Sequence, residues 1–263
     1  MSDRPAAIQA ERAERPSSRA ILREVLALWA ISFGGIVATR VAGFAIPWIG
    51  AQVKAVAAAL FLYLPGHAIR KRGETLDDYA TPDWPWTSPA AARQFRRDLA
   101  WGLGVSLVLF PPFVLAFFGF LELVPHLPPD LRVALTPYRG AGAEIAFRLP
   151  ERFWLHVADQ FLVVALPEEF FYRGYVQTRL GQAWGEGRRR LLGVPVGAAF
   201  WFTQVLFAVG HLGQLHFWRL AVFFPAILFG WLRARTGSIV PGIIVHALSN
   251  LVLMTLEASA FGP

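Results

Sequence analysis

The sequence predicts an all-α protein that crosses a membrane several times, as a polytopic transmembrane helical bundle. Hydrophobic residues make up 55% of its 263 residues and charged residues only 16%. A soluble domain of this length needs fewer apolar side chains to fill one core, so the excess must face lipid. The apolar residues gather in runs of roughly 20, the length that a helix needs to cross the ~30 Å hydrocarbon core of a bilayer.

These runs predict about seven membrane spans, with eight as the alternative. They show no alternation of apolar and polar residues, which a membrane β-barrel would require, and an open sheet leaves its backbone unpaired in lipid. The predicted spans are residues 25–49, 51–69, 99–122, 153–177, 196–214, 217–232 and 238–260. For the fifth span, Gly193, Pro195 and Gly197 place the start of the helix near residues 196–198.

We expect three regions along the chain and no second folded domain. Residues 1–24 form a basic cytoplasmic tail, residues 25–150 hold the N-terminal membrane helices and their loops, and residues 151–260 form a C-terminal membrane region. The first apolar run is too long for a signal-peptide core, which predicts a retained helix. Cysteine is absent, which excludes disulfides and thiolate metal sites.

The charges indicate how the chain is oriented. With the N-terminus placed in the cytoplasm, 17 of the 25 Lys and Arg residues fall in cytoplasmic segments and four in outer segments. Short cytoplasmic loops are enriched in these residues, so the bias predicts a cytoplasmic N-terminus. The net charge of +7 is then explained by topology, and we expect no nucleic-acid partner.

Charged residues interrupt the apolar run at residues 161–175. Glu169 and Arg173 are four positions apart, so they share a helix face and are expected to pair. Glu168 points about 100° away and lacks that partner. An unpaired carboxylate beside a paired one suits base chemistry, although a Glu–Arg pair can also be a structural clamp.

Two later helices bring further polar groups to membrane depth. His211 lies in one of them, and His246 and Asn250 share a face of the last. Each intramembrane polar group costs insertion free energy unless it faces a partner or water, so we expect them to line one water-filled cavity with Glu168. Glu168 would take a proton from water, and the His–Asn pair would donate to an oxyanion. A single His on an apolar face is more often a core residue.

Three short motifs in this region are similar to those of the CPBP family (CAAX-processing and bacteriocin-processing, or Abi), in its bacterial branch. The motifs are Glu168-Glu169-Phe170-Phe171-Tyr172-Arg173, then Phe207-Ala208-Val209-Gly210-His211, then His246-Ala247-Leu248-Ser249-Asn250. The resemblance covers roughly residues 153–253 and implies an intramembrane endopeptidase of the bacterial inner membrane. The bond that it cleaves would lie near the C-terminus, or in a membrane-embedded signal, of a protein substrate with a membrane-associated segment, as in a sorting enzyme that trims C-terminal signals.

The resemblance also implies roles for the motif residues. Glu168 would be the catalytic base, oriented by Glu169 and Arg173, while His211, His246 and Asn250 position water and stabilise the oxyanion. The family is treated either as metal-dependent or as glutamate peptidases, and the sequence leaves both open. Glu168, His211 and His246 could hold a divalent ion such as Zn²⁺ with one open position.

Two other functions and a few further polar residues stay open at this stage. A non-catalytic scaffold or immunity protein of the same fold would tolerate loss of Glu168, and a proton-coupled transporter would also carry intramembrane Glu, Arg and His. Asp159 is a candidate partner behind the site. Arg40 and Lys54 are expected to reach the membrane surface or to pair with each other.

Overall fold

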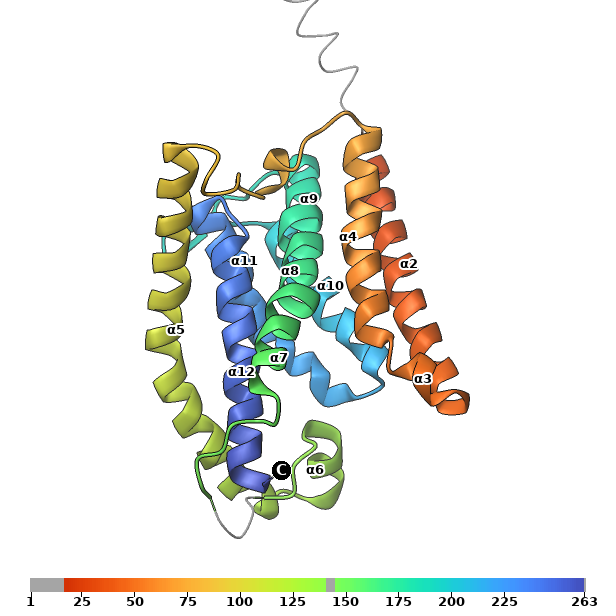
Figure 1. The fold of residues 1–263 in the computed structure, drawn as a ribbon. Helices are drawn as coiled ribbons and strands as arrows, with labels where there is room; N and C mark the ends of the chain where they lie inside the picture. Colours follow the sequence, from red (N-terminus) through yellow and green to blue (C-terminus); the bar gives the residue numbers. More distant parts are fainter. Residues whose placement is uncertain (1–16, 141–144, 263) are drawn as a thin grey trace, which may run out of the picture.

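The computed structural model describes residues 17–140 and 145–262, and it shows an all-α bundle with one short hairpin (Figure 1). The all-α prediction is confirmed. Most of the predicted 1–24 tail lies outside the described residues, and the first described helix begins at Ser18, within the last part of that tail. The first half of the chain forms α2 (Ser18–Ala45), α3 (Pro47–Gly50), α4 (Val53–Lys71), η1 (Asp77–Tyr79), α5 (Pro89–Leu123), η2 (Val124–His126) and α6 (Pro129–Leu135).

Short polar residues fix where the long helices begin. Ser17 accepts a hydrogen bond from the Ala20 N–H and caps α2, and Ser88 caps α5 in the same way. Such caps satisfy amide groups that have no partner inside the helix. Pro89 at the first position of α5 needs no such partner.

The second half contains one long helix with two π-helical stretches, a hairpin, and three further α-helices. The elements are α7 (Phe153–Ala158), η3 (Asp159–Ala165), α8 (Leu166–Glu169), η4 (Phe170–Val176), α9 (Gln177–Trp184), β1 (Arg189–Leu191), β2 (Val194–Val196), α10 (Ala198–Gly210), η5 (His211–Gln214), η6 (Phe217–Val222), α11 (Phe223–Thr236) and α12 (Val240–Phe261). In the hairpin, β1 pairs antiparallel with β2.

Four described helices are individually long and apolar enough to cross a membrane: Ser18–Ala45, Pro89–His126, Phe217–Thr236 and Val240–Phe261. The other predicted spans also coincide with helices, with one clear difference. α10 has 13 residues, about 20 Å at 1.5 Å per residue, so residues 196–214 do not form a full span. The chain turns through η5 and η6 before α11 returns.

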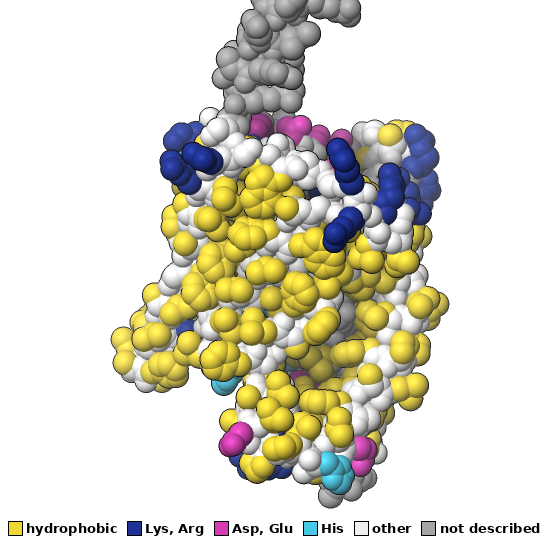
Figure 2. Space-filling view, turned by 180° about the vertical axis from the view of Figure 1, so that it is seen from behind, with side chains coloured by type: hydrophobic (Ala, Val, Ile, Leu, Met, Phe, Trp, Pro, Cys, Tyr) yellow, Lys and Arg dark blue, Asp and Glu magenta, His cyan; other side chains and the backbone are white. Residues whose placement is uncertain are grey.

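The helix ends divide between two ends of the bundle. The start of α2, the end of α4, the start of α5 and the end of α9 lie at the upper end in Figure 1, and the C-terminus lies at the lower end. Figure 2 shows Lys and Arg gathered at the upper end above a broad hydrophobic belt. The bundle therefore presents an apolar surface to lipid between two polar ends, one of them basic.

Candidate active site

The helix that carries Glu168 and Glu169 is wider than an α-helix on both sides of them. η3 and η4 are π-helical, with α8 between them. The Leu166 N–H bonds to the Phe161 carbonyl, five residues back. Pro167 follows and has no N–H to offer the preceding turn, which favours a local change of winding. Such π-helical stretches occur often at functional sites.

Glu169 and Arg173 form the predicted pair, completely buried. Arg173 Nη1 donates to Glu169 Oε1 over 2.9 Å, and both side chains are 0% exposed. Arg173 Nη2 also donates to Gln204 Oε1 and to the Ala226 carbonyl, each at 3.1 Å. The guanidinium therefore holds α10 and α11 against the helix of Glu169.

Glu169 also fixes the orientation of His246. His246 Nδ1 lies 3.0 Å from Glu169 Oε1. An ionised carboxylate only accepts hydrogen bonds, so Nδ1 carries a proton and donates. In the neutral ring Nε2 then has a free lone pair, and it lies 3.9 Å from Glu168 Oε2.

His211 is held in the same sense by its own helix. Its Nδ1 lies 2.9 Å from the Phe207 carbonyl, which can only accept, so Nδ1 donates there. His211 Nε2 lies 4.0 Å from Glu168 Oε2. Glu168 Oε2 is itself buried and has no hydrogen-bond partner among the described residues.

Three acceptor atoms thus converge on one small space. Separations of 3.9 and 4.0 Å are too long for direct hydrogen bonds but suit a bridging water. A water there donates to two of the atoms while a lone pair stays free.

The aromatic and glycine neighbours hold these groups in place. The Phe229 ring stacks on His246 with centroids 4.8 Å apart, and the Phe207 ring lies 4.6 Å from His211. Gly242 packs closely against Glu169, because a Cβ there would lie 3.0 Å from Glu169 Oε2, tighter than ordinary van der Waals contact.

The depth of the site follows from two helix boundaries. The helix of Glu168 continues to Trp184, seven residues beyond the predicted end, so Glu168 lies about 24 Å from that end. His211 lies about 20 Å beyond the first residue of α10, which begins at Ala198 as expected. The two side chains therefore reach the same level and meet.

Asn250 lies one turn beyond His246 on α12, and its partner is a residue that the sequence analysis missed. Asn250 Nδ2 donates to Gln160 Oε1 over 2.8 Å. Gln160 and Gln204 are buried amides inside apolar runs, and that signal was readable in the sequence. Phe229 and Gly242 lie outside the three motifs of the sequence analysis.

The partner of one surrounding charge differs from expectation. Lys54 does not pair with Arg40, because both side chains are cations; its Nζ lies 2.7 Å from Asp159 Oδ2. The pair joins α4 to η3. Arg40 Nε is buried without a hydrogen-bond partner in residues 17–140 and 145–262.

The donor set of Glu168, His211 and His246 has the chemistry of a zinc site, but its spacing does not fit. Two ligand atoms of a tetrahedral zinc lie roughly 3.4 Å apart, given bonds of about 2.0–2.1 Å. Within the part of the chain that the structure describes, no group of three His, Cys, Asp or Glu side chains is close enough to hold a metal ion. No step below therefore passes through a metal.

A comparison with protein families decides what this region is. Residues 150–252 match the family described as type II CAAX prenyl endopeptidase, Rce1-like. This region belongs to the CPBP family. The match holds all six candidate residues and indicates a membrane-embedded protease of the CAAX type, with a protein substrate.

Comparisons with curated proteins and with solved structures gave no match. The first 149 residues lie outside the family match. They include α2, α4 and α5, which pack against the matched region in one bundle (Figure 1).

Proposed function

We propose that the protein is an intramembrane endopeptidase that uses Glu168 to activate water. One observation carries the proposal: the buried Glu168 Oε2, which has no hydrogen-bond partner within the described part of the chain, faces Nε2 of both His211 and His246 at about 4 Å. A carboxylate within reach of a water and of ring nitrogens can accept the water's proton as a general base.

The proposed reaction is the hydrolysis of a peptide bond. One proton of the water moves to Glu168, and the hydroxide oxygen bonds to the substrate carbonyl carbon. The C–N bond then breaks, its electron pair stays on nitrogen, and that nitrogen takes the proton from Glu168. The products are a carboxylic acid and an amine.

Each remaining residue has a role consistent with its contacts. Arg173 holds α10 and α11 against the helix of Glu168, and Glu169 fixes the orientation of the His246 ring. Glu168 accepts one hydrogen bond from the water, and Nε2 of either His211 or His246 accepts the other. Either ring donates from Nε2 only after gaining a proton. Asn250 is then the neutral donor to the oxyanion. This differs from the sequence-based expectation, in which His246 and Asn250 both donate.

The proposed substrate is a protein with a membrane-associated segment, cut near its C-terminus or within a membrane-embedded signal. A sorting enzyme that trims C-terminal signals fits this description. We propose that the protein lies in the bacterial inner membrane. Its N-terminus would lie in the cytoplasm, because 17 of the 25 Lys and Arg residues then fall in cytoplasmic segments of the sequence.

The activity test uses purified protein in liposomes with two quenched fluorescent peptides that end in a CAAX sequence, one farnesylated and one unmodified. Wild-type protein should release the C-terminal fragment, identified by mass spectrometry, and Glu168→Gln should not. In the host, C-terminal peptides of membrane proteins should change when the wild-type gene is replaced by the Glu168→Gln variant. Identical results for the two proteins in both assays would overturn the proposal and favour the scaffold or immunity role.

The orientation is tested separately. Reporter fusions at Asp83 and Gly262 should report opposite sides of the membrane, since the two positions lie at opposite ends of an odd number of crossings. If both fusions report the same side of the membrane, the proposed topology is wrong.

A further inference from the structure

Gln160 lies between the candidate oxyanion donor, Asn250, and the half-buried carboxylate of Asp159. Its Oε1 accepts from Asn250 Nδ2 at 2.8 Å, and its Nε2 donates to Asp159 Oδ2 at 3.0 Å. Gln160 is 6% exposed, so neither bond competes freely with bulk water. Its side chain therefore links Asn250 of α12 to Asp159 of η3.

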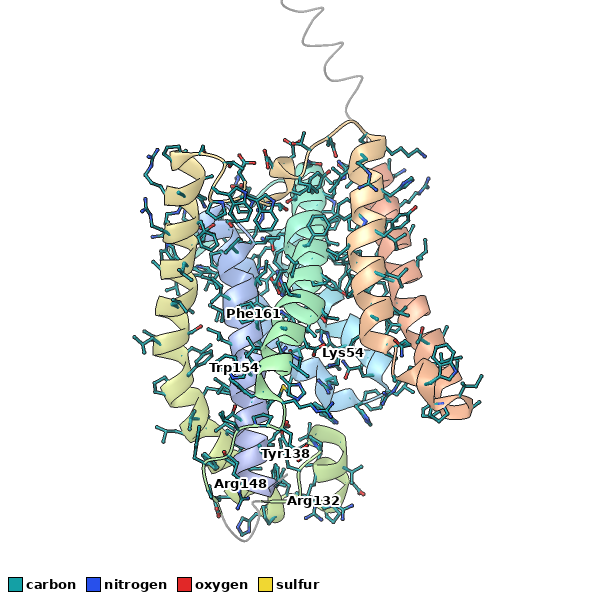
Figure 3. All side chains as sticks on the ribbon, viewed as in Figure 1. Lys54, Arg132, Tyr138, Arg148, Trp154 and Phe161 are labelled. Carbon is teal, nitrogen blue, oxygen red and sulfur yellow. The ribbon has the colours of Figure 1, made fainter. Side chains whose placement is uncertain are left out.

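A lysine from the first half of the chain holds the far end of this link. Lys54 Nζ donates to the same oxygen, Asp159 Oδ2, over 2.7 Å. Figure 3 labels Lys54 on α4, on the side that faces the lower part of the 153–184 helix. Lys54 and Asp159 form an ion pair, in which the carboxylate is the hydrogen-bond acceptor.

The Asp159 carboxylate sets the direction of the hydrogen bonds that run through Gln160 to Asn250. It can only accept, so Gln160 must turn its NH₂ group towards Asp159 and its carbonyl towards Asn250. Asn250 must in turn present its NH₂ to Gln160. One N–H of that planar group is used by Gln160, and the second stays free at a fixed angle.

We propose that Gln160 is a positioning residue that fixes the Asn250 amide with its second N–H ready to donate to the oxyanion, and that the Asp159–Lys54 pair anchors it. The inference rests on the proposed function, since it needs Asn250 to act in the reaction. A donor that is already oriented adds no reorganisation cost when charge develops on the substrate oxygen. Without Gln160, the amide is free to rotate and to present its carbonyl instead.

The test measures cleavage of the farnesylated CAAX peptide in liposomes. Gln160→Met removes both hydrogen bonds and keeps the length of the side chain. Loss of one oxyanion donor lowers kcat about 10²–10³-fold, and misplacing it should lower kcat by roughly 10–10²-fold with KM little changed. Asp159→Asn removes the acceptor-only group and should lower kcat in the same way.

Gln177→Met is the matched control. Gln177 lies in the same long helix, is also 6% exposed, and donates to the Gly230 carbonyl at 3.3 Å. Its loss should affect thermal stability as much as Gln160→Met does, with kcat of the folded fraction unchanged.

The decisive readout is the coupling between Gln160 and Asn250. In an Asn250→Ala background, Gln160→Met should cause no further loss of kcat, because the group that it orients is gone. Equal fold losses in both backgrounds, or wild-type kcat in Gln160→Met, would overturn the inference while leaving the proposed function intact. If Asn250→Ala itself has wild-type kcat, the assignment of Asn250 fails and the inference fails with it.

Discussion

Removing the charge of Glu169 should destabilise the bundle far more than removing the charge of Glu168. Glu169→Gln leaves the Arg173 guanidinium, which is 0% exposed, without its carboxylate 2.9 Å away. Breaking a buried ion pair from one side costs about 3–5 kcal/mol. Arg173 keeps two carbonyl oxygens and lies 4.2 Å over the Phe207 ring, so we expect the lower end, about 3 kcal/mol.

Glu168→Gln is the matched control, because the two residues are adjacent in sequence and the change is the same. Glu168 has no ion pair with Arg or Lys and contacts two His rings only at 3.9 and 4.0 Å. Its loss should change the free energy of unfolding by less than about 1 kcal/mol, as for a substitution that removes no direct bond. Activity should nevertheless be abolished.

The assay is reversible unfolding in mixed detergent micelles, followed by tryptophan fluorescence, alongside cleavage of the farnesylated peptide. A third protein, Glu169→Met with Arg173→Met, removes both charges and should recover most of the stability that Glu169→Gln loses, since an apolar pair leaves no buried charge. Equal unfolding free energies for the Glu168 and Glu169 variants would refute the reasoning. No recovery in the double variant would show that packing, and not charge, stabilises this point.

Three further outcomes follow from the structure. In Gly242→Ala the new Cβ would lie 3.0 Å from Glu169 Oε2 and displace that oxygen, which should lower the free energy of unfolding by about 1–3 kcal/mol and also lower kcat. Gly119→Ala is the control, because a Cβ there meets nothing described within 4 Å, and it should change neither quantity. Treatment with 1,10-phenanthroline should leave peptide cleavage intact, and loss of activity that Zn²⁺ restores would contradict the water-only site. Burial and a hydrogen bond to Glu74 raise the pKa of Tyr79 to about 12. The folded state favours the neutral phenol, so this contribution to the free energy of unfolding is complete below pH ~10 and is lost as pH rises towards 12. Tyr79→Phe should flatten the dependence of stability on pH in that window.

Local spacing predicted the parts of the site that depend on one helix. Glu169 and Arg173 pair because positions four apart share a face even next to π-helical turns. Polar groups inside apolar runs were expected to meet, and Glu168, His211 and His246 do. These predictions needed only helical geometry and the cost of polar groups in lipid.

Features that depend on packing between distant segments were not predictable. Residues 178–184 are too polar to read as a span, yet α9 continues through them to Trp184 with Arg179 and Leu180 buried. The partner of Lys54 lies 105 positions away, and no local pattern marks Asp159 as that partner.

The support of the site extends beyond the region that carries the family match. Trp29 of α2 donates its indole N–H to the Leu206 carbonyl of α10 at 3.1 Å, one turn before His211. Gly210 faces the Tyr172 hydroxyl so closely that a Cβ there would lie 2.6 Å from it. α2 and the helix of Glu168 therefore flank the end of α10 and fix where His211 emerges, while Lys54 of α4 anchors Asp159 on the other side. The six candidate residues come from residues 150–252, but helices outside that range contact the segments that carry them. The geometry of the candidate site therefore depends on the whole bundle.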